Sequence, residues 1–124
     1  MDRPPAPDMK PDELIGFPGS PGIVQGTVKV VREVSDAGKL NPGDIMVTEY
    51  TLPSWTPLFA RTAALVADSG GVLSHSAVVA REYGISAVVG TGTATAIIRD
   101  GQVIEVEGTA GRVRMVSRND NMQL

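Results

Sequence analysis

The chain has 124 residues, of which 42% are hydrophobic and 20% charged, and its formal net charge is −3. This length allows one domain with its own core, and an acidic chain without a Lys/Arg cluster argues against nucleic acid or an anionic membrane as the main partner. The sequence holds no cysteine, so disulfides, thiolate chemistry and Cys-based metal sites are excluded. Its single histidine, His75, and its scattered carboxylates give no set of metal ligands. It shows neither a signal peptide nor an apolar run of ~18 residues, so we expect a cytoplasmic protein.

The first half of the chain predicts a leader, a loop and two strands. Residues 1–13 are rich in proline and charge and predict a flexible leader. Residues 16–22 contain three glycines and two prolines and predict an irregular loop. Alternating and β-branched residues predict a strand over 23–31, and a second short strand over 45–48 follows the turn sequence NPGD at 41–44.

The second half predicts a strand–helix–strand unit and a hairpin. One or two helical turns are expected at 58–61, strands at 63–67 and 87–89, and a hairpin within residues 99–116. A helix is expected over 75–83, so the flanking strands should run parallel. The predicted fold is mixed α/β, a compact β-sandwich or partial barrel with few helices, spanning 14–118 and followed by a tail at 119–124.

The segment 70–84, GGVLSHSAVVAREYG, places the single histidine where a glycine turn becomes a helix. Gly70 and Gly71 permit backbone angles that other residues resist, and Ser74 is a favourable N-cap, which makes His75 the first helical residue. Gly84 is expected to end the helix at its C′ position. The free N–H groups of a helix start favour a neutral imidazole, which can attack an electrophile, and they also suit a phosphate. These properties favour a phosphoryl-accepting histidine, although an exposed cap or an ordinary surface histidine fits the local pattern too.

Several other residues have two interpretations. Ser74 is an N-cap or a hydrogen-bond partner of the phosphoryl group, and Ser76 faces solvent or donates to a bound phosphate. Arg81 makes a structural ion pair or cap contact, or else binds phosphate. The aromatic residues Trp55 and Phe59 are expected in the core, with contact to a docked partner as the alternative.

The stretch SGGVLSHSAVVAREYGISAVVGTGTAT closely resembles the phosphohistidine segment of the mobile, or swivelling, domain of phosphoenolpyruvate-utilising enzymes. GFPGSPGIVQGTV, LNPGDIMVTEYTLPSWTPLF and DGQVIEVEGTAGRV resemble further parts of that domain, so the likeness covers about residues 15–116. Two positions depart from the usual pattern. Ser86 replaces a proline and Ser69 a common threonine, and both changes are expected to loosen the following loop without removing the nucleophile.

The resemblance implies a swivelling β/β/α fold in which His75 carries the phosphoryl group, Gly70 and Gly71 form its turn, and Ser74, Ser76 and Arg81 support the phosphate or the turn. It also implies that this chain binds no cofactor or metal, because an ATP-grasp partner supplies Mg²⁺ and ATP. We expect a phosphocarrier subunit of a multi-subunit dikinase-type phosphotransferase, a free-standing subunit rather than an excised domain, that is inactive alone. A phenol or aromatic alcohol is the favoured small-molecule acceptor, with pyruvate or an antibiotic also possible. The alternatives are a binding module that takes no phosphate and a carrier in a protein-to-protein relay.

Overall fold

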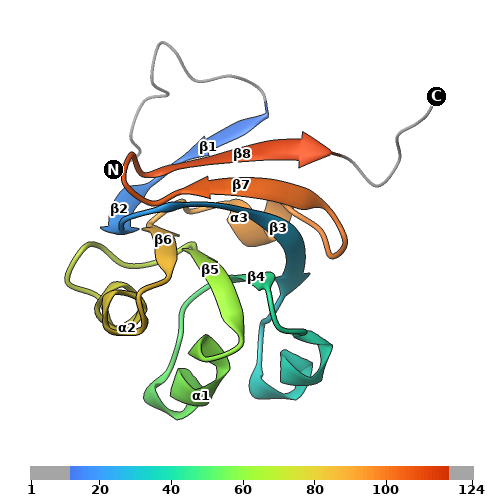
Figure 1. Ribbon diagram of the computed structural model, residues 1–124, viewed down its shortest axis with the longest axis vertical. Helices are drawn as coiled ribbons and strands as arrows, with labels where there is room; N and C mark the ends of the chain where they lie inside the picture. The colour runs from blue at the N-terminus through green and yellow to red at the C-terminus, as the bar shows by residue number, and fades with distance from the viewer. Residues whose placement is uncertain (1–11, 118–124) are drawn as a thin grey trace.

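Figure 1 shows the computed structural model of the chain, which describes residues 12–117. The strands are β1 (Glu13–Ile15), β2 (Phe17–Ser20), β3 (Ile23–Val30), β4 (Asp44–Thr48), β5 (Thr62–Ala67), β6 (Ser86–Val89), β7 (Val103–Glu107) and β8 (Arg112–Ser117). The helices are α1 (Thr56–Phe59), α2 (His75–Tyr83) and α3 (Ala94–Ile97), with 3₁₀ turns η1 (Val34–Lys39) and η2 (Pro53–Trp55). The predicted tail and all but the last two residues of the predicted leader lie outside the described residues.

The strands of residues 12–117 form one sheet in the order β1-β8-β7-β3-β4-β5-β6-β2. Strands β3 to β6 run parallel to one another, and the remaining pairs are antiparallel. Because β1 and β2 lie at opposite ends of this order but are separated in sequence by Gly16 alone, the sheet has to curl until its ends meet. At that point the Gly16 N–H donates to the Gly111 carbonyl over 2.8 Å. The predicted mixed α/β partial barrel is therefore confirmed.

The two larger hydrophobic clusters lie on the two faces of the parallel strands. Ile45 and Val47 of β4 face the interior of the barrel, and Met46 between them packs on the other side with Trp55 and Phe59. This alternation follows from the two-residue period of a strand, and both faces are covered, which is typical of parallel strands. Figure 1 shows α1 and α2 covering the side of β5 and β6 that is turned away from β7 and β8. The core positions predicted for Trp55 and Phe59 are confirmed, since they are 4% and 1% exposed.

The amino-terminal part of the domain is more regular than the sequence prediction. The expected loop at 16–22 contains β2, which pairs antiparallel with β6. Pro18 is tolerated because β2 is the last strand in the order, so its missing N–H does not remove a hydrogen bond to a second neighbouring strand. Glu13, the last residue of the predicted leader, belongs to β1 and is 6% exposed. The prediction of an irregular loop was wrong because pairing with a distant strand outweighs the local preference of glycine and proline.

Most other elements agree with the sequence prediction within one or two residues. The parallel β5–α2–β6 unit and the β7–β8 hairpin are confirmed. The short helix expected at 58–61 begins earlier, at Thr56, and follows the 3₁₀ turn η2. The sequence analysis did not predict η1 or α3, which are short and lack a hydrophobic period long enough to recognise.

Asp44, the first residue of β4, ties the NPGD turn to the neighbouring strand. Its Oδ2 accepts hydrogen bonds from the Asn41 N–H and from Lys29 Nζ, each over 2.8 Å. Burial raises the pKa of this carboxyl, yet the hydrogen bonds from Lys29 and Asn41 outweigh burial and hold the pKa below its ordinary value of 3.8. The ionised form of Asp44 is therefore more stable in the folded than in the unfolded chain.

This pKa difference predicts a pH dependence of stability. A depressed folded-state pKa contributes stability above the unfolded-state value, near 3.8, and the contribution is lost as the pH falls through the folded-state pKa. In Asp44→Asn we expect the free energy of unfolding to be lower at neutral pH and to change less between neutral and acid pH. Urea unfolding of both chains at a series of pH values measures this difference. Equal pH dependence in the two chains would contradict the assignment.

Candidate functional site

The connection between β5 and α2 has the backbone geometry that the glycine and serine pattern predicts. Gly70 has a φ of +103°, and a Cβ added there would lie 2.8 Å from the Ser74 side chain. Ser74 is the N-cap of α2, and its Oγ accepts from the Ala77 N–H over 3.3 Å. At the other end Gly84 has a φ of +71°, and the Ile85 N–H donates to the Ala80 carbonyl over 3.0 Å. The predicted helix, its N-cap and its C′ glycine are confirmed.

His75 lies at the first position of α2 with its ring half-buried. Its Nδ1 is hydrogen-bonded to Thr51 Oγ1 over 2.8 Å, and Thr51 Oγ1 in turn lies 2.7 Å from Ser76 Oγ. Within residues 12–117, Nε2 has no hydrogen-bond partner. The ring is therefore anchored through one nitrogen, and the other nitrogen is left for chemistry.

Thr51 is a site residue that the sequence analysis missed, because it lies 24 positions before His75. A topological signal exists nonetheless. Thr51 follows the end of β4, and His75 follows the end of β5, and the carboxyl ends of parallel neighbours meet at one edge of a sheet. Recognising Thr51 required knowledge that β4 and β5 are parallel and adjacent.

Ser76 does not face solvent as the sequence analysis favoured. It is 4% exposed, and its hydroxyl points to Thr51, which is 7% exposed. The reason is tertiary: the second residue of α2 lies on the side of the helix that faces the loop after β4.

Arg81 holds the loop before α2 against β2. Its Nη1 donates to the Gly19 carbonyl over 2.6 Å, and its Nη2 donates to the Val72 carbonyl over 2.8 Å. These contacts agree with the structural interpretation, although the partners are carbonyl groups and not a carboxylate or the cap itself. Arg81 thus connects the helix, the edge strand and the segment that follows Gly70 and Gly71.

We expect Arg81→Met to loosen this segment. The variant keeps a long aliphatic side chain but loses two charge-assisted hydrogen bonds, so we expect a loss of about 1–3 kcal/mol in the free energy of unfolding. Amide hydrogen exchange should also become faster at residues 70–74. Glu82→Gln, at the next position of the same helix and exposed, is the matched control. Exchange that stays as slow as in the unchanged chain would show that Arg81 does not hold the loop.

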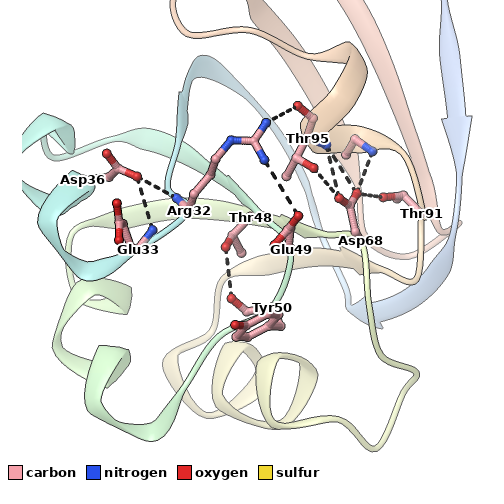
Figure 2. Close-up of polar contacts among 10 residues, drawn as sticks. Arg32, Glu33, Asp36, Thr48, Glu49, Tyr50, Asp68, Thr91 and Thr95 are labelled. Carbon is pink, nitrogen blue, oxygen red and sulfur yellow. Dashed lines mark hydrogen bonds and ion pairs between the residues drawn. The ribbon is translucent and has the colours of Figure 1, made fainter.

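A polar network fixes the end of β5 just before Gly70 (Figure 2). The Asp68 carboxylate accepts from the Thr91 hydroxyl over 3.0 Å, from the Ala94 N–H over 2.6 Å and from the Thr95 hydroxyl over 2.6 Å. Arg32 donates to the Thr95 carbonyl over 2.9 Å and lies 3.8 Å from the Glu49 carboxylate. Asp68 therefore joins the strand that leads to the histidine loop to the start of α3.

Ser86 and Ser69, the two positions that depart from the usual family pattern, both make hydrogen bonds. Ser86 is 2% exposed, and its Oγ donates to the Gly22 carbonyl over 2.8 Å and accepts from the Gly108 N–H over 3.1 Å. The Ser69 N–H donates to the Glu49 carbonyl over 2.9 Å. The expected loosening of the following loop stays a prediction at both positions.

Residues 12–117 contain neither a cluster of metal ligands nor a membrane-spanning helix. The His, Asp and Glu side chains of this part do not form a group of three that suits a metal ion. The helices of the same range are also too short and polar to span a membrane.

Comparison with known proteins identifies the family. Residues 40–111 match the family described as PEP-utilising enzyme, mobile domain. The chain is 52% identical over 112 residues to chondramide synthase of Chondromyces crocatus, and the match covers 90% of this chain and 3% of that protein. It is 49% identical to rifampicin phosphotransferase of Streptomyces sviceus (89% of this chain, 13% of that protein). It is 44% identical to phosphoenolpyruvate synthase of Aeropyrum pernix (90% of this chain, 14% of that protein).

Solved structures support the same assignment. The solution structure of an Enzyme I protein aligns with 67% of this chain and 34% of its own, with a TM-score of 0.57 and 28% identity. Aconitase X of Thermococcus kodakaraensis aligns with 85% of this chain and 98% of its own at a TM-score of 0.65, and its 16% identity indicates a shared fold alone. The chain spans only 3–14% of the length of the relatives named above. With the family match, the relatives and the fold in agreement, this chain belongs to the mobile-domain family of the phosphoenolpyruvate-utilising enzymes.

Proposed function

We propose that His75 carries a phosphoryl group on Nε2. The observation that supports this most directly is the asymmetry of the ring, in which Nδ1 is bonded to Thr51 while Nε2 has no partner within residues 12–117. In the first step the Nε2 lone pair attacks the phosphorus of the donor, and the bond from phosphorus to the leaving oxygen breaks. In the second step an acceptor oxygen attacks the same phosphorus, the N–P bond breaks, and the lone pair returns to Nε2.

The surroundings of the His75 ring suit a domain that carries a phosphoryl group into the active sites of its partners. His75 lies at the N-terminal end of α2, where free N–H groups and the helix dipole favour a negative phosphoryl group. Gly70 and Gly71 place no side chains beside the loop, and Ser74 and Arg81 hold its shape. Val72 and Leu73 are 45% and 85% exposed just before the ring, and exposed apolar side chains suit contact with a partner surface.

The donor and the acceptor are both supplied from outside residues 12–117. We propose an ATP-grasp partner that holds Mg²⁺ and ATP, because phosphoryl transfer needs metal and cationic groups around the charge, and this acidic domain supplies few of them. The domain is therefore inactive alone, whether the partner is a separate subunit, as expected from the sequence, or another part of one chain. A phenol or aromatic alcohol is the acceptor class to test first, and rifampicin and pyruvate follow because relatives bear the names rifampicin phosphotransferase and phosphoenolpyruvate synthase.

Labelled ATP tests this function. The chain is incubated with candidate ATP-grasp partners and with ATP labelled at either the β- or the γ-phosphate. A label on the protein that is acid-labile and alkali-stable, and that later moves to a small molecule, supports the carrier. Label that moves only to another protein favours the relay, and absence of label with every partner favours a binding module.

A further inference from the structure

Exposed apolar side chains gather where the loop after β4 meets the start of α2. The hydrogen bond between Thr51 Oγ1 and His75 Nδ1 joins these two segments over 2.8 Å. Of the eleven large apolar side chains that are exposed in residues 12–117, five lie within three positions of Thr51 or His75. These five, which we call the apolar face, are Tyr50, Leu52, Val72, Leu73 and Val78. Apolar side chains that are exposed together indicate a surface that another molecule covers.

The two segments that carry the apolar face contain no Asp, Glu, Lys or Arg. These residue types are absent from residues 50–60 and 69–80, although they make up 20% of the chain. The charged residues that border the second segment bind to other parts of the domain. The Asp68 carboxylate accepts hydrogen bonds from two threonine hydroxyls, and both Nη atoms of Arg81 donate to backbone carbonyls. Apart from His75, the two segments therefore offer no charge to a partner.

A phosphoryl group on His75 places a strong negative charge among these uncharged segments, about −1.5 to −2 at pH 7. The N–H groups at the start of α2 offer only about half a positive charge. Arg81 lies six positions further along the helix, which is about 9 Å along its axis. The surface that complements this arrangement has an apolar rim around a cationic centre. A site that holds Mg²⁺ and ATP supplies such a centre.

We propose that the apolar face docks against an apolar rim of the ATP-grasp partner's active site. The inference rests on the proposed function in that His75 has to reach the ATP held in that site. Burial of the apolar side chains supplies the affinity of docking, and it also removes water from the place where the phosphoryl group is transferred. Because ion pairs contribute little to such a contact, docking should depend only weakly on ionic strength.

The salt dependence of binding tests the apolar character of the contact. The full 124-residue chain is titrated calorimetrically into each candidate ATP-grasp partner, without ATP, at low and at high concentrations of sodium chloride. Between about 50 mM and about 500 mM salt, we expect the dissociation constant to change by less than about threefold, because apolar burial is not screened by ions. A larger weakening would show that ion pairs hold the complex together and would overturn the proposal.

Substitutions on the two segments test which residues form the contact. Leu73 is 85% exposed, and we expect Leu73→Ser to raise the dissociation constant about tenfold, since burial of a leucine contributes a factor of about ten to a hundred. Leu52→Ser, on the other segment and 45% exposed, should raise it about fivefold. Val34→Ser is the matched control, because it also removes an exposed apolar side chain, 62% exposed, but lies on η1 outside both segments.

Val34→Ser should leave the dissociation constant within about twofold of the unchanged chain, and urea unfolding should show that all three variants remain folded. An unchanged dissociation constant in either Leu73→Ser or Leu52→Ser would overturn the proposal, since both segments belong to the apolar face. Equal weakening in Val34→Ser would overturn it too, because the contact would then not be confined to this face.

Labelling from ATP separates docking from the carrier function. Leu73→Ser and Leu52→Ser should raise the partner concentration for half-maximal labelling by the same factors as the dissociation constant, with an unchanged rate at saturating partner. If a partner binds in the expected way but the unchanged chain takes no label, the carrier function fails and the docking surface stands. If label is taken up and neither variant alters its partner dependence, the docking proposal fails and the carrier function stands. Binding by none of the ATP-grasp candidates, or only by a protein that supplies the acceptor, would also overturn the docking proposal.

Discussion

A His75→Gln chain is expected to take up no phosphoryl label from any ATP-grasp partner that labels the unchanged chain. The substitution removes the nucleophilic nitrogen, and loss of a nucleophile commonly lowers such rates by more than about a thousandfold. The fold should survive, because the ring is half-buried at a helix start and lies outside both main cores. The measurement is incorporation of label from ATP into the protein, with circular dichroism and urea unfolding as checks on the fold.

The matched control for this experiment is Glu82→Gln, on the same helix and exposed. It should be labelled at the rate of the unchanged chain. Residual label in His75→Gln with the acid lability of a phosphoramidate would be inconsistent with His75 as the carrier, since the chain has no second histidine.

The second large effect is expected for stability, in Asp68→Ala. The Asp68 carboxylate accepts hydrogen bonds from Thr91, Ala94 and Thr95, and its removal leaves the start of α3 without these acceptors. Hydrogen bonds to a charged group contribute more than neutral ones, and a buried donor without a partner costs about 1–3 kcal/mol. Because several donors lose one shared acceptor, we expect a loss of about 3 kcal/mol in the free energy of unfolding, measured by urea denaturation.

In the folded fraction of Asp68→Ala, the phosphorylation rate should stay close to that of the unchanged chain. Asp68 holds the end of β5 and touches neither His75 nor Thr51, so the folded fraction should still accept label. Glu82→Ala, which also removes one carboxylate but an exposed one, should change the free energy of unfolding by less than about 0.5 kcal/mol. A loss below about 1 kcal/mol in Asp68→Ala would show that the network in Figure 2 is not a structural tie.

Features governed by neighbouring residues were predictable from the sequence. Helix α2 begins and ends where expected, because Ser74 caps one end and Gly84 adopts the left-handed conformation at the other. The strands β5, β6, β7 and β8 were recognisable because their hydrophobic residues follow strand patterns over several positions. These signals need only a few consecutive residues, so they can be recognised in the sequence without knowledge of the fold.

Features that depend on distant pairing were not predictable in this way. The segment that became β2 contains glycine and proline, which favour a loop locally, yet β6 offers it a ladder of hydrogen bonds. The orientation of Ser76 was assigned to solvent because nothing within its own helix indicates that Thr51 lies opposite. The role of Asp68 was not predictable, because its partners come from residues 23 to 27 positions later.

The sequence of residues 70–84 was sufficient to place one imidazole at the start of a capped helix and to identify the family, because caps, turns and motifs are encoded within a single turn or loop. The arrangement of parallel strands then determined that Thr51 lies beside His75 and that Nε2, and not Nδ1, is left without a partner within residues 12–117. The physical reason is that the groups folded against the ring decide which nitrogen is hydrogen-bonded and which is left free, and Thr51 comes from the end of another strand.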